Sequence, residues 1–440
     1  MSMIAVLSSP RPRSLRYAHK SLYGRTNVRD GLQRSVDRVV RNDNCTGCGG
    51  CALVSSRITM TLGDDGYRRP VVANDVKATV QSSRREAEFF KAVCPGVRIV
   101  APRRDGREYH PIFGSYVSAW QGWASDEETR YSGSSGGVLT ALSSWLVTSG
   151  RRASVTASAA DSKDPKLTRP VVLTASDDFT IASGSRYAPV SNMVAYDPYS
   201  ESSVLVGKPC EVSAAARLSS ELGLERSESP LLLSFFCAGT PSQNGTEKLV
   251  ALMAEDPEGV SDVRYRGNGW PGDFTVTTAS GDAFKMSYDE SWGHHIGRDI
   301  QWRCKLCVDG TGGDSDIAVG DYWYADANGY PKFDNADGNS VILARTLRGH
   351  ELLTAAASQG VVVIAGIDLD SVAKIQPLQV ERKVTLVGRL LGRLVSGKRV
   401  PVYRGFGLTR LAMGRPQQNL RAMAGTAKRS ISLRRWKRRS

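Results

Sequence analysis

The hydrophobic positions in the second half of the chain fall into short blocks that predict strands and helices in alternation. Val204-Leu205-Val206 is an apolar run typical of a buried strand, and the helical pattern that follows it ends at Gly223. The full pattern predicts strands over 204–206, 231–236, 340–346 and 361–365, and helices over 211–222, 242–254 and 349–358. Strand–helix alternation favours a parallel or mixed sheet, so we expect an α/β (α+β mixed) fold.

The first half of the chain gives fewer regular elements. Residues 58–74 alternate weakly around the turn Gly63-Asp-Asp-Gly66 and predict a hairpin, and residues 76–92 have a helical pattern. The Cys-dense segment 44–55 lies just before this hairpin. Together these segments predict a small cysteine-bearing module.

A second helix is predicted over 138–149, after the loop Ser132-Gly-Ser-Ser-Gly-Gly137. Its apolar residues fall on one face, and Gly150 is a favourable stop. The polar stretch 151–168 predicts a loop. Residues 324–339 are rich in Gly, Asp and Asn and predict an exposed insertion.

Composition narrows the class of protein. The chain has 440 residues, of which 41% are hydrophobic and 23% charged, as in globular proteins that fold in water. No apolar run approaches the ~18 residues of a membrane-spanning helix. The opening segment is too short for the apolar region of a secretion signal. We therefore expect a cytoplasmic protein, which could lie peripheral to a membrane through its charged end.

The net charge of +14 is concentrated at the C-terminus. Residues 391–440 contain 14 Lys and Arg and no Asp or Glu, so the rest of the chain is formally neutral. Such a segment can contact an anionic membrane surface, an acidic protein or nucleic acid, or it can be a disordered solubilising tail. The pattern Arg434-Arg-Trp-Lys-Arg-Arg439 favours a membrane surface or an acidic protein, and nucleic acid is the weakest of these alternatives.

Half of the eight cysteines form a first set. Cys45-Thr-Gly-Cys48-Gly-Gly-Cys51 has the tight spacing of bacterial ferredoxins, whose remaining thiolate comes from a Cys-Pro pair such as Cys94-Pro95. Gly47, Gly49 and Gly50 are expected to supply the positive φ angles of this wrap. A zinc site is the alternative, but it would favour separated Cys pairs or added His. The first cysteine set (Cys45, Cys48, Cys51, Cys94) therefore predicts an iron–sulfur cluster.

The other four cysteines form a second set. Cys210 and Cys237 follow neighbouring predicted strands, where open α/β sheets gather their sites, and Cys304-Lys-Leu-Cys307 adds a pair. Cys210 and Cys237 could instead be small buried apolar residues. The second cysteine set (Cys210, Cys237, Cys304, Cys307) completes four thiolates and predicts a second cluster.

Weaker signals concern a flavin and the proton chemistry. The loop Ser132–Gly137 before a helix could hold a phosphate, although Gly/Ser-rich turns before helices are common. His294 and His295 could donate protons or simply be exposed, as could Asp289 and Glu290. Lys208 could pair with a phosphate or a cluster, or be a surface lysine.

Several segments together make the chain resemble a known family, the beta subunits of coenzyme F420 (deazaflavin) hydrogenases and dehydrogenases. The segments are Cys45–Cys51, Ser135–Ala141, Gly184–Tyr187, Gly207–Ala214, Phe236–Ser242, Arg266–Gly272, Cys304–Cys307 and Gly320-Asp321. Their order and spacing hold over about 43–345. Segment 308–315 is more Gly-rich than the family pattern.

The resemblance implies an FAD-bearing oxidoreductase with two [4Fe-4S] clusters. It passes electrons between the clusters, FAD and a two-electron acceptor, either a deazaflavin coenzyme or an organic substrate. Each cysteine set would hold one cluster. The residues against the flavin would be Ser134, Ser135, Gly136, Gly137, Asn268, Gly269, Trp270 and Gly272. The redox partner would be a ferredoxin, the deazaflavin coenzyme or a partner subunit.

These inferences divide the chain into four parts. They are a basic N-terminal extension (1–42), a ferredoxin-like iron–sulfur module (43–115), a mixed-sheet FAD and second-cluster domain (116–375) and a basic C-terminal tail (376–440). Two other functions remain open at this point. One is an electron-relay beta subunit without a substrate of its own, and the other is a nucleic-acid-binding protein with structural clusters.

Overall fold

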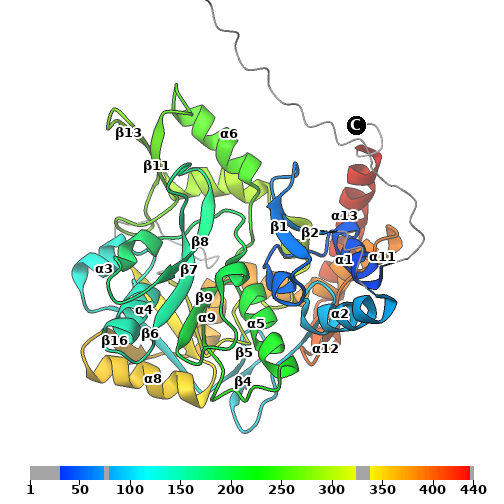
Figure 1. Ribbon diagram of the computed structural model, residues 1–440, viewed down its shortest axis with the longest axis horizontal. Helices are drawn as coiled ribbons and strands as arrows, with labels where there is room; N and C mark the ends of the chain where they lie inside the picture. The colour runs from blue at the N-terminus through cyan, green and yellow to red at the C-terminus, as the bar shows by residue number, and fades with distance from the viewer. Residues whose placement is uncertain (1–29, 74–78, 324–336, 437–440) are drawn as a thin grey trace, which may run out of the picture.

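The computed structural model describes residues 30–73, 79–323 and 337–436. Within these residues the centre is an eight-stranded sheet in the order β16-β6-β15-β14-β10-β9-β7-β8 (Figure 1). In chain order its strands are β6 (Ser118–Ala124), β7 (Ser154–Ala160), β8 (Thr168–Leu173), β9 (Ser203–Gly207), β10 (Leu231–Phe235), β14 (Ile317–Tyr322), β15 (Asn339–Ala344) and β16 (Val362–Gly366).

The sheet is parallel in its middle and antiparallel toward both edges. β14, β10, β9 and β7 pair in parallel, whereas β15, β6 and β16 on one side and β8 on the other pair antiparallel. This confirms the expected mixed α/β fold. The carboxyl ends of the parallel strands meet at one edge, where open sheets of this kind bind ligands.

Helices cover both faces of the sheet, because residues along its strands alternate between two cores. α4 (Val138–Thr148) and α8 (Leu347–Ser358) pack with Val204 and Leu231 on one face. α5 (Pro209–Glu221) packs with Leu205 and Leu232 on the other, beside α9 (Leu369–Ile375). The result is a three-layer arrangement with apolar side chains on both inner surfaces.

The N-terminal module (residues 30–100) is a smaller unit on the right of Figure 1. It contains α1 (Gly31–Arg41), the short 3₁₀ helix η1 (Gly50–Leu53), the hairpin β1 (Ile58–Leu62) and β2 (Arg68–Val72), α2 (Val80–Val93) and β3 (Arg98–Val100). Leu32, Val36, Val39, Ile58 and Phe90 form its core. The predicted hairpin and helix are confirmed, and α1 occupies the end of the expected N-terminal extension, whose first 29 residues lie outside the described part.

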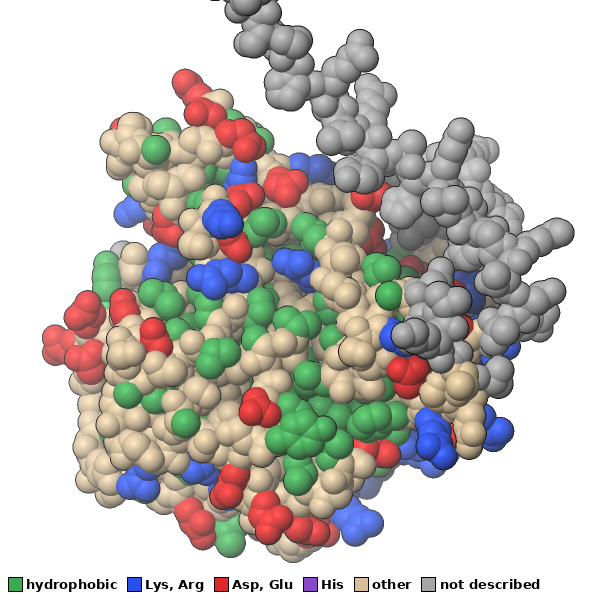
Figure 2. Space-filling view, viewed as in Figure 1, with side chains coloured by type: hydrophobic (Ala, Val, Ile, Leu, Met, Phe, Trp, Pro, Cys, Tyr) green, Lys and Arg blue, Asp and Glu red, His purple; other side chains and the backbone are tan. Residues whose placement is uncertain are grey.

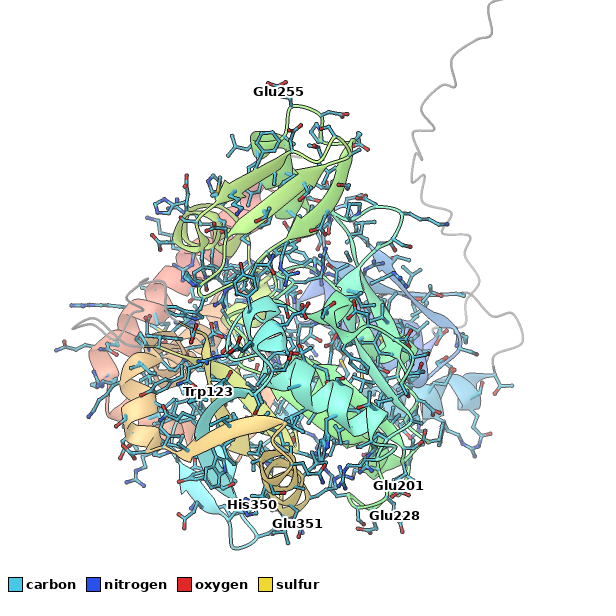
Figure 3. The ribbon with its side chains drawn as sticks, turned by 90° about the vertical axis from the view of Figure 1, so that its left-hand side faces the viewer. Trp123, Glu201, Glu228, Glu255, His350 and Glu351 are labelled. Atoms are coloured by element: carbon cyan, nitrogen blue, oxygen red, sulfur yellow. The ribbon has the colours of Figure 1, made fainter. Side chains whose placement is uncertain are left out.

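A lobe made by residues 243–298 rises from the sheet. It contains α6 (Gln243–Met253), the antiparallel strands β11 (Val260–Arg264), β12 (Phe274–Thr278) and β13 (Ala283–Met286), and a π-helical turn at Asp289–His295. Figure 3 shows Glu255 at its far end, opposite Glu201, Glu228 and Glu351 at the base of the sheet domain. Val263, Tyr265 and Phe274 lie in its separate core.

The C-terminal segment is folded against the body, which corrects its interpretation as a tail. It forms α10 (Pro377–Val384), α11 (Leu386–Val395), β17 (Val402–Arg404), α12 (Leu408–Met413) and α13 (Pro416–Trp436). α11 lies so close to α13 that a Cβ at Gly392 would be 2.5 Å from the Met423 oxygen. Arg393 is 1% exposed and pairs with Asp43 at 3.0 Å, so the segment contacts the N-terminal module.

The remaining predictions had mixed outcomes. The predicted helix over 138–149 and the strands and helices between 204 and 365 are confirmed with small shifts of their ends. The loop predicted over 151–168 is wrong, because β7 occupies its middle as a strand of the central sheet. The predicted insertion over 324–339 falls almost entirely outside the described residues.

The other short elements are α3 (Glu127–Ser132), α7 (Trp302–Lys305), β4 (Glu108–His110), β5 (Gly114–Tyr116), η2 (Phe179–Ala182), η3 (Asn192–Ala195) and η5 (Ile296–Arg298).

Membrane insertion through a helix finds no support in the described ranges. None of the helices there combines the length and the apolar character that crossing a bilayer requires.

Candidate functional site

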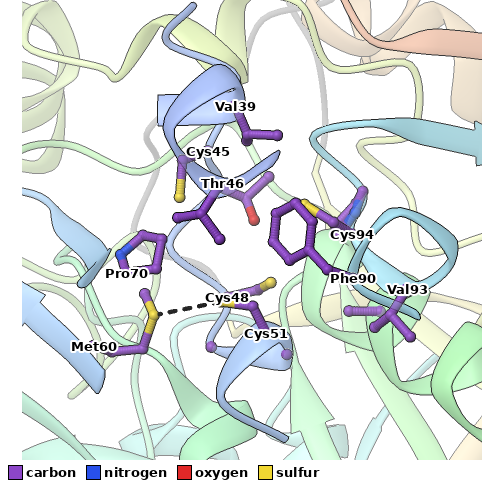
Figure 4. A pocket seen from close by; sticks show the side chains of 15 residues that line it. Val39, Cys45, Thr46, Cys48, Cys51, Met60, Pro70, Phe90, Val93 and Cys94 are labelled. Atoms are coloured by element: carbon purple, nitrogen blue, oxygen red, sulfur yellow. Dashed lines mark hydrogen bonds between the residues drawn. The ribbon is translucent and has the colours of Figure 1, made fainter. Parts of the chain in front are cut away.

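The first cysteine set lines one cavity in the N-terminal module. Cys45, Cys48, Cys51 and Cys94 surround it together with apolar residues, and Figure 4 shows sulfur atoms turned toward the shared space. The spacing in the sequence and the Cys-Pro pair at the end of α2 therefore meet at one place.

Two glycines allow the backbone to wrap this cavity. Gly47 and Gly49 have φ angles of 73° and 88°, in the left-handed region that favours glycine. The Gly47 N–H donates to Cys45 Sγ at 3.4 Å. The expectation of a positive φ at Gly50 is wrong, because this residue begins the 3₁₀ helix η1.

The surroundings keep these thiols protonated in the absence of a cation. Burial raises the pKa of the Cys94 thiol to about 12, and the neighbouring Cys48 and Cys45 add to the effect. Phe90, Val93 and Met60 contribute the apolar lining. Such thiols become thiolates when a metal group supplies positive charge, so the donor set fits one.

The second cysteine set lies at the carboxyl ends of the central strands. Cys210 is in the first turn of α5 after β9, Cys237 follows β10, and Cys304 and Cys307 lie in and after α7. Burial raises the pKa of Cys237 to about 12, and the charges of Cys304 and Cys307 also act on it. The Thr240 N–H donates to Cys304 Sγ at 3.4 Å.

Cys210 connects the two sets electrostatically. Burial raises the pKa of its thiol, and both Cys48 and Cys237 add to the rise. Arg303 joins the sets structurally, since it donates to the oxygens of Pro95 at 3.1 Å and Leu306 at 3.3 Å. The two groups of cysteines are therefore adjacent parts of one site.

Lys208 is a buried residue, and the alternative of a surface lysine is wrong. Its side chain is 6% exposed and pairs with Glu211 at 2.6 Å. Because Glu211 caps the start of α5 through the Lys208 N–H at 2.9 Å, this pair fixes the turn that presents Cys210.

The two loops expected to contact a flavin lie against each other. Arg264 and Arg266 donate to the oxygens of Ser132 and Ser134, each at 2.6 Å. The Gly269 N–H donates to the Tyr131 oxygen at 2.9 Å. Segments more than 130 residues apart thus lie against each other where the lobe meets the sheet domain. Among the residues expected at the flavin, Asn268 is exposed, Ser134, Gly269 and Gly272 are partly exposed, and Trp270 is buried.

Close packing by itself requires glycine at positions 136 and 137. A Cβ at Gly136 would be 2.7 Å from the Gly122 oxygen in β6, and one at Gly137 would be 2.5 Å from the Thr129 oxygen. The Gly136 N–H already donates to Ser340 Oγ at 3.0 Å, and Ser135 Oγ donates to the Asn339 oxygen at 2.7 Å. These residues position the loop, while Ser134 lies nearer its partner loop and bonds Ser185 Oγ at 2.8 Å.

A groove of about 390 Å³ runs beside these loops. Its lining includes Ser183, Ser185, Arg186, Arg264 and Arg266. Figure 2 shows Lys and Arg side chains gathered in the hollow between the lobe and the sheet domain. Asp161 and Asp262 also line this groove, where the arginines outnumber them.

Sequence reasoning missed the role of Arg266. This residue is 3% exposed, pairs with Asp321 at 2.7 Å, donates to Tyr187 Oη at 3.3 Å and lies over the Tyr288 ring. The signal was present, because Arg266, Tyr187 and Asp321 each belong to a segment that carries the family resemblance. Arg266 holds these three segments together.

The histidines and acids of the lobe are peripheral. His294 is exposed in the π-helical turn, as are Asp289 and Glu290. Exposure is therefore the interpretation that the structure supports for His294, Asp289 and Glu290, whereas His295 is half-buried.

Across the part of the chain that the structure describes, no three His, Cys, Asp or Glu side chains form a site for a single metal ion.

Comparison with known proteins identifies two matching family models. Both describe the beta subunit of coenzyme F420 hydrogenase/dehydrogenase: the model of its N-terminal part matches residues 119–197, and the model of its C-terminal part matches residues 201–370. A chain of the F420-reducing [NiFe] hydrogenase complex from Methanosarcina barkeri is similar over 63% of this chain and 96% of its own length, with 21% identity and a TM-score of 0.46. No curated protein matches the chain.

Proposed function

The chain belongs to the coenzyme F420 hydrogenase/dehydrogenase beta-subunit family, and from this we propose that it is an oxidoreductase carrying two [4Fe-4S] clusters and FAD. The observation that carries the proposal is the cavity lined by all four cysteines of the first set. The second set would hold the second cluster. The clusters would supply one-electron transfer and the flavin would convert it to two-electron chemistry.

Cys48 of the first set and Cys237 of the second both raise the pKa of Cys210, which supports an arrangement in which the two clusters exchange electrons. FAD would lie on the surface made by Ser134 and Asn268–Gly272, with the basic groove beside it. The groove would take an anionic two-electron acceptor, which fits a deazaflavin coenzyme.

Iron and sulfide analysis of the anaerobically purified full chain tests the clusters. We expect about eight iron and eight sulfide per chain, as two four-iron clusters require. Cys304→Ser should lower both to about four, and Ser280→Ala, in the exposed turn between β12 and β13, should leave them unchanged. Stoichiometric zinc without sulfide, or about four iron per chain in parent and C304S alike, would contradict the two-cluster proposal.

FAD is tested by the visible spectrum and by chromatography of the released cofactor. Gly136→Val is a poor probe, because its side chain would meet β6 whether or not a flavin binds. Asn268→Gly is a better one, since it keeps the φ of 57° and removes only an exposed side chain. We expect weaker FAD retention in N268G than in the S280A control.

An electron-relay role without an own substrate is the second candidate, and the family description favours it because it names a subunit. Reduction of a deazaflavin by the isolated chain with an artificial electron donor separates the two. Turnover by the chain alone supports the oxidoreductase, and turnover that appears only with a partner subunit supports the relay.

We also propose that the outer face of the C-terminal helices contacts an anionic membrane surface. Arg404, Arg410, Arg415, Arg421 and Lys428 are exposed, and in the described ranges none has a carboxylate within 4.0 Å. Leu420 is 62% and Met413 69% exposed among them. Cations mixed with apolar side chains are typical of surfaces that bind lipid headgroups.

A further inference from the structure

A buried arginine without an acidic partner lies beside the second cysteine set. Arg303 is 1% exposed, and its guanidinium donates only to two backbone oxygens, those of Pro95 and Leu306. Among the residues that the structure describes, no carboxylate lies within 4.0 Å of it. A buried charge without a charged partner is costly, so a negative group at this place would be stabilising.

A second arginine approaches the same cysteines from the C-terminal segment. Arg382 of α10 is 7% exposed and donates to the oxygens of Cys237, at 2.9 Å, and Ala238. It too has no carboxylate within 4.0 Å in the described part of the chain. Two buried cations therefore face one group of four thiols.

Three other buried cations of this protein pair with a carboxylate, whereas Arg345 and Lys383 are buried and donate to backbone oxygens instead. Arg266 pairs with Asp321 at 2.7 Å, Arg393 with Asp43 at 3.0 Å, and Lys208 with Glu211 at 2.6 Å. The first cysteine set has a weaker counterpart in Arg217, which contacts the oxygens of Ala92 and Arg98 but is only half-buried. Water screens the electrostatic interactions of a half-exposed charge, whereas those of a buried charge are screened much less.

Arg303 lies at the second set by its place in the chain and by its bonds. It directly precedes Cys304 in α7, and it donates to the oxygen of Leu306, next to Cys307. Lys208 lies near Cys210 in the chain, but it is paired with Glu211. Arg303 and Arg382 are therefore buried cations at the second set that no carboxylate of the described residues pairs with.

We infer that Arg303 and Arg382 are positioning residues that offset the negative charge of the cluster held by the second cysteine set and favour its reduced form. The inference rests on the proposed function. Reduction adds one electron, and therefore one negative charge, to a site already bound by four thiolates. Nearby buried cations stabilise that added charge and raise the midpoint potential.

A redox titration of the full chain with dithionite, followed by electron paramagnetic resonance, tests this. The variants are Arg303→Gln and Arg382→Gln, which remove charge, and Arg303→Lys, which keeps it. Arg345→Lys is the matched control, because Arg345 is also fully buried and bonded to backbone oxygens, but no cysteine acts on its charge.

We expect R382Q and R303Q each to lower the midpoint potential of the second cluster. A tenfold lower ratio of reduced to oxidised cluster at a given potential corresponds to about 59 mV for one electron. R303K should restore the potential of the parent, and R345K should not move it. The potential of the first cluster should change less than that of the second in every variant.

The outcomes separate the inference from the proposed function. A parent protein that contains no iron after anaerobic purification overturns the proposed function. A parent with both clusters whose second potential is unchanged in R382Q and in R303Q overturns the inference alone. If R303Q assembles no second cluster, the other two variants test the inference. An unchanged potential of the second cluster in R382Q, or a shifted one in R303K, which keeps the charge, would contradict the inference.

Discussion

Single residues with unusual backbone angles shape the first cysteine site. Gly49 has a φ of 88°, and a Cβ there would lie 3.0 Å from Val194 Cγ1 and 3.1 Å from Ser191 Cβ. An L side chain in the left-handed region costs about 1 to 2 kcal/mol before any contact is counted. The glycine is therefore required both by the wrap around the cysteines and by the segment packed behind it.

Gly49→Ala should accordingly lower the iron content of the first site. Gly114→Ala is the control, because Gly114 has a similar φ of 83° but no atom within 4 Å of the added Cβ. Both variants bear the backbone strain, and only the first displaces the cysteine wrap. Iron per chain and the melting temperature are measured together. Equal iron in G49A and G114A would show that the contact with Val194 does not matter.

Two neighbouring carboxyls, Asp314 and Asp316, differ in their environment. Burial and the charge of Asp309 raise the pKa of Asp314 to about 6. Burial would also raise the pKa of Asp316, but the pairs with Arg348 at 2.7 Å and Arg226 at 3.3 Å lower it. Folding thus favours the protonated form of one carboxyl and the ionised form of the other.

The two Asn variants should therefore differ both in the sign of their effect on stability and in its dependence on pH. The contribution of protonated Asp314 is present below about pH 4 and is lost as pH rises through about 6. Because a pKa difference of one unit corresponds to about 1.4 kcal/mol, Asp314→Asn should gain about 1 to 3 kcal/mol relative to the parent between pH 5 and pH 7.5. Asp316→Asn should be destabilised at both values. Denaturant unfolding at the two pH values measures this, and a D314N difference that does not change with pH would refute the assignment.

At the scale of elements, the sequence was informative where hydrophobic blocks are long and unambiguous. β9, β10, α4, α5, α6 and α8 were predicted because each has an apolar face matched to its period. β7 was missed because Ser154–Ala160 is built of small and polar residues, and it becomes a strand only between β8 and β9. Tertiary burial, which no local pattern contains, decides such a segment.

The candidate site was predictable to a similar extent. The cysteine sets could be proposed from spacing alone, and the first one does line a single cavity. The sequence alone could not show why glycine is needed at position 136, because the strand that packs behind it comes from residues 118–124. The contact of Arg382 with Cys237 could not be predicted either, since no local pattern indicates that a helix of the C-terminal segment reaches Cys237.

Two glycines of the C-terminal helices allow a matched test of helix packing. Gly392 in α11 faces the backbone of α13, where a Cβ would be 2.5 Å from the Met423 oxygen, and Gly425 in α13 faces only the flexible end of Arg429 at 3.4 Å. Gly392→Ala should destabilise the protein by about 1 to 3 kcal/mol through overpacking. Gly425→Ala should be neutral or stabilise it by up to about 1 kcal/mol, because Ala favours a helix. Thermal unfolding measures both effects. Stabilisation by both variants would contradict the close packing of α11 on α13.

For the whole molecule, the excess positive charge lies in the folded C-terminal segment. The C-terminal cations lie on folded helices whose inner residues, such as Arg393, are part of the packing. A truncation at Leu390 would cut through α11, so it would unfold the segment as well as remove charge. Single neutralisations on the outer face keep the fold and change only the surface.

Replacing Arg410, Arg415, Arg421 and Lys428 by Gln should weaken sedimentation with anionic liposomes. Each cation near such a surface contributes about 1 kcal/mol, so the loss should be at least tenfold in the partition coefficient and should resemble the effect of high salt. Replacing the exposed lobe residues Lys248 and Lys285 by Gln, compared with the double replacement of Arg421 and Lys428, is the control for net charge. Unchanged liposome binding by the quadruple variant would refute the membrane proposal. Binding to acidic protein but not to liposomes would identify the other partner.

The pairing of β17 with β3 has a consequence for how the protein is made. Val402 of β17 lies in register with Arg98 of β3, so the edge strand of the N-terminal module is completed by residues near the end of the chain. Translation at about 5 to 20 residues per second separates the two strands by roughly 15 to 60 s. During that interval the first cysteines have left the ribosome without their last neighbours. The edge of the module therefore stays open until β17 has been made, and the thiols lack this neighbour for the whole of that interval.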